Sequence, residues 1–472
     1  MTAVHPVAGP GTPADIGLPA DPRKHPKGLY LLFTTEMWER MSYYGMRALL
    51  TLYMVDKTRG GLGLDDKTAL QIYGIYTALV FLTPLAGGYL ADRYLGQRRA
   101  VVIGGTMMMI GQFLLAMSGL PAFYAGLSML ILGNGMFKPN IATMVGGLYP
   151  KGDARRDSAF TIFYMGINSG ALLAPLISGT LGETVGWHYG FAAAGLGMGL
   201  GIATFLLFNK RFLGNVGLRP GSPGRPEVAR GRPLTREEWQ RILVLFILVL
   251  FSVFFWAAFE QAGGLMNLYT KSKLNRYVFG WEIPATWFQA VNPLGIILLG
   301  PVFSSLWLGL ARKGKDPAPP VKLGLGLILV GIGFLFLCGA ARQSAAEGKA
   351  ALMWMVATYV FHTFGELCLS PVGLSTANKL APSHLASLLM GVWYLSNVMG
   401  NYLSGWIGGL AGQLGEFELF LSVAAGTMVA GALLLAISKP LHKMMHGADK
   451  IQAEPLIDPK SQAELPPKPK LA

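Results

Sequence analysis

Long apolar segments recur along most of the chain and are separated by short polar loops. About 20 consecutive apolar residues suffice for a helix to cross the roughly 30 Å hydrocarbon core of a bilayer. The pattern predicts twelve such helices, near residues 29–55, 69–91, 100–118, 122–148, 158–182, 189–208, 241–270, 284–311, 322–340, 350–379, 385–411 and 417–438. We therefore expect an all-α membrane protein with twelve transmembrane helices.

The longest polar interruption, residues 209–238, is rich in Gly, Pro and Arg and divides the predicted helices six and six. The predicted organisation is an N-terminal tail (1–27), a six-helix bundle (28–208), a linker (209–238), a second six-helix bundle (239–446) and a C-terminal tail (447–472). The spacing from Pro139 to Pro150 recurs from Pro371 to Pro382, which indicates an internal repeat. A binding site between two such repeats is typical of alternating-access carriers.

The repeat register brings polar positions of the two bundles together in one cavity. It pairs Arg40 with Trp256, Tyr44 with Glu260, and Lys138 with Ser370.

Composition and charge agree with this assignment. Of the 472 residues 52% are hydrophobic and 14% charged, which is not typical of a soluble protein. The basic residues concentrate in the loops on one side of the predicted helices, as the positive-inside rule requires of cytoplasmic loops. We therefore expect both termini in the cytoplasm and a location in a bacterial-type inner membrane. The scattered basic residues favour contact with anionic lipid over nucleic-acid binding.

Charged residues also occur inside the first predicted helix, where lipid would penalise each by about 2.5–3.5 kcal/mol. At 100° per residue, six polar side chains share an arc of roughly 140°. This set is Glu36, Glu39, Arg40, Tyr43, Tyr44 and Arg47. Such a face must meet protein or water.

Across the predicted helices the deep acids outnumber the deep bases by one. The acids are Glu36, Glu39, Glu260 and Glu366, and the bases are Arg40, Arg47 and Lys138. Protonating one carboxylate would neutralise the set, so the pattern predicts transport driven by the proton gradient, without a cofactor. Two alternatives remain: the charges only hold the helices together, or the coupling ion is sodium.

Residues 36–44, EMWERMSYY, resemble the E-x-x-E-R-F-x-Y-Y signature of the proton-dependent oligopeptide transporter (POT) family of the major facilitator superfamily. Further matches are Lys138-Pro139-Asn140, residues 163–170, Phe255-Trp256, Glu260-Gln261, Asn292-Pro293, Gly365-Glu366 and Trp393. The loop 88–99 is similar to the superfamily's G-x-L-A-D-R-x-G-R-K loop. The resemblance extends from about residue 28 to about residue 440.

This resemblance implies a major facilitator fold and a proton-coupled symporter that imports di- and tripeptides by alternating access, as a monomer. It also implies residue roles. Arg40, Tyr43, Tyr44, Lys138 and Asn168 would bind the peptide carboxylate, and Asn292 and Glu366 the amino group. Phe81, Trp256, Ser370 and Trp393 would line side-chain pockets. Glu36, Glu39, Arg40, Lys138 and Glu260 would handle protons, and Arg47 and Glu260 would form a gating salt bridge.

The chain departs from the family pattern at two positions: Phe81 stands where a substrate-contacting Tyr is expected, and Met41 replaces the usual Phe. Other functions remain as alternatives: a transporter of nitrate or another small anion with the same fold, a channel, or a membrane enzyme. Against an enzyme, the sequence shows no nucleophile triad and no metal-ligand constellation. His362 and Glu366 are four residues apart, but no further ligand accompanies them, so we expect no metal.

Overall fold

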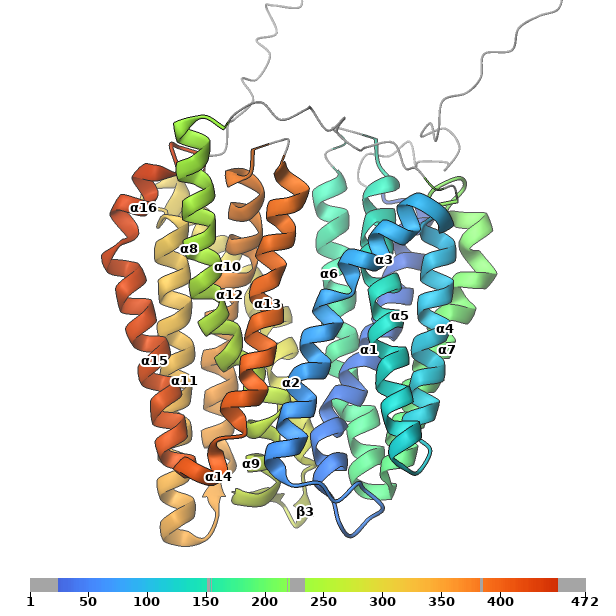
Figure 1. Ribbon diagram of the computed structural model, residues 1–472, viewed down its shortest axis with the longest axis vertical. Coiled ribbons are helices and arrows are strands. Elements are labelled where there is room, and N and C mark those ends of the chain that lie inside the picture. Colours follow the sequence, from blue (N-terminus) through green and yellow to red (C-terminus); the bar gives the residue numbers. More distant parts are fainter. Residues whose placement is uncertain are drawn as a thin grey trace, which may run out of the picture.

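The computed structural model describes residues 24–150, 153, 155–218, 220, 234–382 and 385–448. Most of both expected tails and the central part of the expected linker lie outside these ranges. Figure 1 shows two groups of helices standing side by side, one running from α1 to α7 and the other from α8 to α16. We call the end at which α1 begins and α16 lies the terminal end, and the end at which α9 and α14 lie the far end.

In the part of the chain that the structure describes, the first group contains seven α-helices and three π-helical segments. Its elements are α1 (Lys27–Val55), α2 (Asp66–Leu82), α3 (Pro84–Leu90), η2 (Ala91–Leu95), α4 (Gln97–Leu115), α5 (Leu120–Gly147), α6 (Arg155–Ala174), η3 (Pro175–Gly179), η4 (Leu181–Val185) and α7 (Trp187–Phe212).

Among the described residues, the second group contains nine α-helices, two 3₁₀ segments and short strands. Its elements are α8 (Arg236–Phe259), η5 (Glu260–Gly263), α9 (Leu265–Lys273), β1 (Leu274–Asn275), β2 (Tyr277–Val278), β3 (Trp281–Glu282), η6 (Ala285–Ala290), α10 (Val291–Arg312), α11 (Pro319–Glu347), β4 (Ala350–Ala351), α12 (Leu352–Leu380), α13 (Ala386–Gly408), α14 (Ala411–Leu414), α15 (Glu416–Ala436) and α16 (Ser438–Met444). Strand β1 pairs in parallel with β4, and β2 pairs antiparallel with β3.

Within the described ranges, nine helical segments are long and apolar enough to cross a membrane. The three other expected spans correspond to the helices α1, α4 and α13. The number of membrane-crossing helices therefore stays a prediction.

Local sequence explains several helix ends. The Asp65 carboxylate accepts a hydrogen bond from the Thr68 backbone N–H at 3.0 Å and caps α2. A capping box formed by Thr235 and Glu238 starts α8. These contacts satisfy backbone N–H groups that the first turn of a helix leaves without partners.

The span expected at 241–270 is not one continuous helix. It breaks into α8, the 3₁₀ turn η5 and α9, and Gly264 at the break has φ −105° and ψ −107°, outside the helical region. The apolar pattern alone predicted one uninterrupted span over these residues. The interruption places Glu260 at the end of α8, facing the first group.

Helix α1 lies at the centre of the first group and packs against α6 and α7. Its face opposite the charged stripe contacts α7 closely: a Cβ atom on Gly197 would lie 2.7 Å from the Met41 sulfur, and one on Gly201 would lie 3.0 Å from Trp38 Cβ. The small residues of α7 thus let two helices approach closely, as in membrane bundles generally. Both cysteines, Cys338 and Cys368, are buried and free.

The two groups meet mainly through α2 and α13. At their crossing, a Cβ atom on Gly74 would lie 2.7 Å from Gly405 Cα, so this approach requires glycine. Further contacts join the groups toward the far end. Thr51 of α1 donates to the Gly263 carbonyl at 2.9 Å, and the Asn267 amide donates to the Ala48 carbonyl at 2.8 Å.

Candidate functional site

A cavity of about 220 Å³ lies between the two groups. The first group contributes Tyr44, Arg47, Phe81, Lys138, Ala171 and Pro175 to its lining. The second contributes Trp256, Phe259, Glu260, Ala262, Gln289, Asn292, Pro293, Ile296, Tyr359, His362, Glu366 and Asn397. A mostly apolar cavity with a few convergent polar groups is typical of a small-molecule site.

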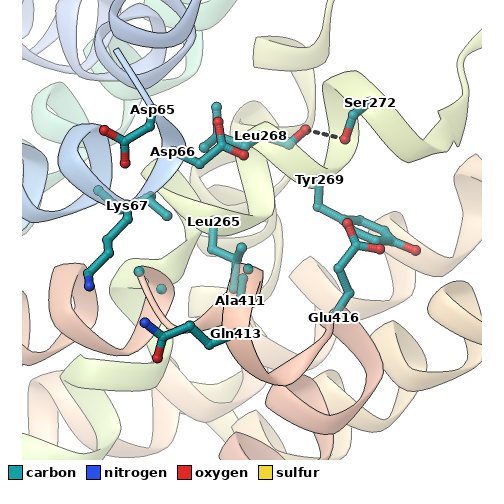
Figure 2. A pocket seen from close by; sticks show the side chains of 14 residues that line it. Asp65, Asp66, Lys67, Leu265, Leu268, Tyr269, Ser272, Ala411, Gln413 and Glu416 are labelled. Carbon is teal, nitrogen blue, oxygen red and sulfur yellow. Dashed lines mark hydrogen bonds between the residues drawn. The ribbon is translucent and has the colours of Figure 1, made fainter.

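A larger pocket, of about 400 Å³, opens at the far end between α2, α9 and the α13–α15 region (Figure 2). Two of its three acidic residues already have roles: Asp65 caps α2, and the Glu416 carboxylate lies 3.7 Å from the Lys273 ammonium. Its lining includes none of the predicted site residues. We therefore place the candidate site in the smaller cavity.

The charged stripe of α1 divides into two sets. Near the terminal side of the stripe, the Arg40 guanidinium forms hydrogen bonds with both carboxylate oxygens of Glu39 and lies 3.3 Å from Glu36 Oε1. Asn134 of α5 also faces Glu39, with 3.4 Å between Nδ2 and Oε1. We call Glu36, Glu39, Arg40 and Asn134 the inner cluster, since all four belong to the first group and are buried.

Two members of the inner cluster, Glu36 and Asn134, each have a buried oxygen without a hydrogen-bond partner among the described residues, and the carboxylate of Glu36 is the charged one. In Glu36 this oxygen is Oε2. A buried oxygen in this condition is energetically costly, and such atoms in native structures often have a functional role. Tyr43 lies beside this cluster, with its ring 5.1 Å from the Arg40 guanidinium carbon.

Further along α1, Arg47 connects the two groups. Its guanidinium forms a buried salt bridge with Glu260 of η5 and donates to the Tyr73 hydroxyl of α2 at 2.6 Å. We call Arg47, Glu260 and Tyr73 the bridging cluster. Tyr44 lies between the two sets, with both Arg40 and Arg47 within cation–π distance of its ring.

The walls of the cavity carry opposite charges. On the first group's wall, the Lys138 ammonium lies 4.5 Å from the centre of the Phe81 ring. On the second group's wall, the Asn292 amide donates to Glu366 Oε2 at 2.8 Å and to Thr363 Oγ1 at 3.2 Å. A carboxylate oriented in this way by an amide can accept an ammonium group, while the lysine can bind an anion.

The structure brings eight of the sequence-predicted site residues into the cavity lining: Tyr44, Arg47, Phe81, Lys138, Trp256, Glu260, Asn292 and Glu366. The others lie elsewhere: Glu36, Glu39, Arg40 and Tyr43 are buried in α1, Asn168 bonds to the Tyr164 carbonyl, Trp393 packs on Gly373, and the Ser370 hydroxyl is buried in α12.

Several residues that sequence reasoning missed belong to these contacts. Tyr73, Asn134, Gln289 and Glu183 are the clearest. The first three are uncharged residues in apolar spans, so the free-energy cost of membrane insertion does not distinguish them from their neighbours. Glu183 lies one residue beyond the expected span 158–182, where a single acid is unremarkable. Among the described residues no three His, Cys, Asp or Glu side chains gather as a metal site would require.

Comparison with known proteins gives concordant matches. The family model described as the POT family matches residues 98–223 and 233–417. The chain is 37% identical to the peptide transporter YePEPT of Yersinia enterocolitica, over 89% of this chain and 96% of the relative. It is 34% identical to a di-/tripeptide transporter of Lactococcus lactis subsp. cremoris, over 89% of this chain and 96% of the relative.

A crystal structure of a peptide transporter POT in complex with sulfate is also similar. It superposes with a TM-score of 0.86 at 35% identity, over 92% of this chain and 98% of that chain. The expected all-α major facilitator fold is thereby confirmed.

Proposed function

The chain belongs to the POT family of integral membrane transporters, and from this premise we propose that it is a symporter that carries di- and tripeptides together with protons by alternating access. It is a transporter and not an enzyme. The names of the two relatives, a peptide transporter and a di-/tripeptide transporter, support the peptide substrate.

The observation that carries the proposal is the cavity between the two groups, with Lys138 on one wall and the Asn292–Glu366 pair on the other. A short peptide is a zwitterion and needs a basic and an acidic partner at opposite ends. In this proposal Arg40, Tyr43, Tyr44, Lys138 and Asn168 bind the carboxylate end, and Asn292 and Glu366 bind the amino end. Phe81, Trp256, Ser370 and Trp393 accommodate the peptide side chains.

Proton coupling is assigned to Glu36, Glu39, Arg40, Lys138 and Glu260. Glu36 Oε2, which has no hydrogen-bond partner among the described residues, is one position at which a proton can be accommodated without breaking an existing hydrogen bond. Protonation of Glu260 would weaken its attraction to Arg47 and so release one connection between the groups. The proton gradient supplies the energy, and no cofactor is required.

The proposal includes the arrangement in the membrane. In this arrangement the protein is a monomer in a bacterial-type inner membrane, with both termini in the cytoplasm. The linker 209–238 joins the bundles 28–208 and 239–446. The far end then faces outward.

Uptake of a labelled dipeptide into protein-containing liposomes tests this function. An inward proton gradient is expected to accelerate uptake, and unlabelled di- and tripeptides to compete. Absence of gradient-driven uptake across a varied peptide panel would contradict the proposal, and gradient-driven nitrate uptake would favour the anion-transporting alternative.

Replacing Glu366 separates these two substrates further. Glu366→Gln removes the acidic partner of an amino group, and loss of one member of a buried charged pair costs about 2–5 kcal/mol, so peptide uptake should fall at least tenfold. Glu347→Gln, at an exposed position of α11, is the matched control. Unchanged peptide uptake in Glu366→Gln would show that the acidic wall does not bind the substrate.

A further inference from the structure

Glu183 is a buried carboxylate that reaches from the first group to two elements of the second. It lies in η4 and is 7% exposed. Its Oε1 accepts hydrogen bonds from the Thr286 backbone N–H at 2.8 Å and from the Thr286 hydroxyl at 2.9 Å, both in η6. Its Oε2 accepts from the Lys271 ammonium of α9 at 2.9 Å. One side chain therefore connects three elements across the interface.

Neighbouring contacts bring the same elements together. The Trp287 indole donates to Thr180 Oγ1 at 2.8 Å. A Cβ atom on Gly179 of η3 would overlap the Thr286 side chain, so glycine permits the close approach of η3 to η6. The region from Gly179 to Glu183 thus forms a further connection at the far end, built from residues other than those of the bridging cluster. We call it the η4–η6 contact.

The η4–η6 contact is continuous with the cavity wall. Segment η6 ends at Ala290 and runs directly into α10, which starts at Val291. Gln289 and Asn292, on either side of this junction, line the cavity, and Asn292 holds Glu366. A shift of η6 relative to α12 would therefore move the Asn292 amide away from the carboxylate that it orients.

The bonds of Glu183 differ in their surroundings. The Lys271 side chain is 40% exposed, so solvent screens its ion pair with Glu183. Thr286 is fully buried, so its two donors have no water to replace the carboxylate. The two hydrogen bonds to Thr286 should consequently stabilise the contact between the two groups more than the ion pair with Lys271 does.

We infer that Glu183 is a positioning residue for transport: by holding Thr286 it closes the far end and fixes the Asn292 wall of the cavity, independently of the Arg47–Glu260 salt bridge. The effect on substrate rests on the proposed function, because it assumes that Asn292 belongs to the peptide site. The effect on closure does not, since it concerns only the contact between the two groups.

Closure can be measured without substrate. A reporter cysteine replaces Thr51, which is fully buried at the far end, in a chain whose Cys338 and Cys368 are changed to Ala. Because Thr51 itself donates to the Gly263 carbonyl, every labelling rate is compared with that of the same Thr51→Cys chain with Glu183 intact. Labelling by a membrane-impermeant maleimide should be about tenfold faster in Glu183→Ala, since loss of buried hydrogen bonds shifts the equilibrium toward open forms. Glu183→Gln, whose amide oxygen can still accept from Thr286, should restore slow labelling, and Lys271→Gln should label slowly as well.

Peptide exchange across liposomes supplies the second measurement. Glu183→Ala should raise the KM for the dipeptide severalfold with a smaller change in kcat, and Glu183→Gln should recover most of the affinity. Thr286→Val keeps the backbone donor but loses the hydroxyl, so its KM should lie between those of the wild type and Glu183→Ala. This variant replaces Glu183→Ala in the test if Glu183→Ala does not fold.

Two results would overturn the inference. One is labelling of Thr51→Cys at the wild-type rate in both Glu183→Ala and Thr286→Val. The other is an equal increase of the labelling rate and of the KM in Glu183→Gln and Lys271→Gln, which would assign the effect to the ion pair. If labelling changes as expected but no peptide is exchanged by any variant or by the wild type, the closure role stands and the proposed substrate is wrong.

Discussion

The inner cluster and the bridging cluster lie on one face of the same helix but belong to different parts of the molecule. Glu36, Glu39 and Arg40 are paired among themselves, within the first group. Arg47 is paired with Glu260 of the second group. If the groups rock against each other, this motion by itself does not separate the members of the inner cluster, whereas the salt bridge of the bridging cluster contributes only when the far end is closed.

Because of this difference, the two clusters should affect different quantities: the inner cluster the free energy of unfolding, and the bridging cluster the equilibrium between conformations. Interactions kept in all folded states change the free energy of unfolding, and interactions present in one state change the populations of the states. Substitutions in the inner cluster should therefore lower the unfolding temperature. Substitutions in the bridging cluster should mainly change the accessibility of the far end and the transport rate.

The largest effect is expected for Arg40→Gln. It leaves two buried carboxylates without their base, and breaking a buried ion pair by removing one partner costs about 3–5 kcal/mol. Thermal unfolding in detergent should show a clear fall in the unfolding temperature. The triple variant Glu36→Gln, Glu39→Gln, Arg40→Gln should recover part of it, and Arg312→Gln, at an exposed position, should be neutral. An unchanged unfolding temperature in Arg40→Gln would remove the distinction between the clusters.

The second largest effect is expected for Glu260→Gln, in the bridging cluster. The amide keeps the shape but loses the charge that attracts Arg47, so the far end should open more readily and proton-driven uptake should fall about tenfold. The unfolding temperature should change less than in Arg40→Gln. Glu237→Gln, at an exposed position of α8, is the control. A loss of stability as large as that of Arg40→Gln, with unchanged labelling of Thr51→Cys, would contradict this assignment.

A smaller effect is expected for Tyr73→Phe, which removes the hydroxyl that accepts from Arg47 Nε at 2.6 Å. Hydrogen bonds to charged groups contribute about 1.5–3 kcal/mol. Losing part of this energy should weaken the salt bridge, so the far end should open more readily and Thr51→Cys should be labelled faster. Tyr76→Phe is a close control, because Tyr76 lies on the same helix and its buried hydroxyl has no partner among the described residues. Equal behaviour of the two variants would show that the Tyr73 hydroxyl does not support the salt bridge.

The smallest effect is expected for Asn134→Leu. The contact from Asn134 Nδ2 to Glu39 Oε1 is 3.4 Å, longer than a normal hydrogen bond, and Glu39 keeps both bonds to Arg40. The unfolding free energy should fall by about 1 kcal/mol or less, measured by denaturant or thermal unfolding. A loss comparable with that of Arg40→Gln would mean that Asn134 is a principal partner of Glu39.

The sequence by itself determined the membrane character, most helix positions and the polar face of α1. Each follows from local properties: the length of apolar segments, the helical repeat and the cost of charge in lipid. The family signature at 36–44 added the identity of the charged residues near the site, because that motif lies within one helix.

The tertiary structure decided the pairings that neither a local pattern nor the family resemblance names. Glu183 and Thr286 are 103 residues apart, and no local period relates them. Arg47 and Glu260 are 213 residues apart, and only the family resemblance had suggested that pair. The structure also decided the contacts of Tyr73 and Asn134, whose uncharged side chains carry too little insertion cost to stand out in an apolar span. The division of the stripe into two clusters is therefore a property of the assembled helices, since it is set by which helix lies opposite each turn of α1.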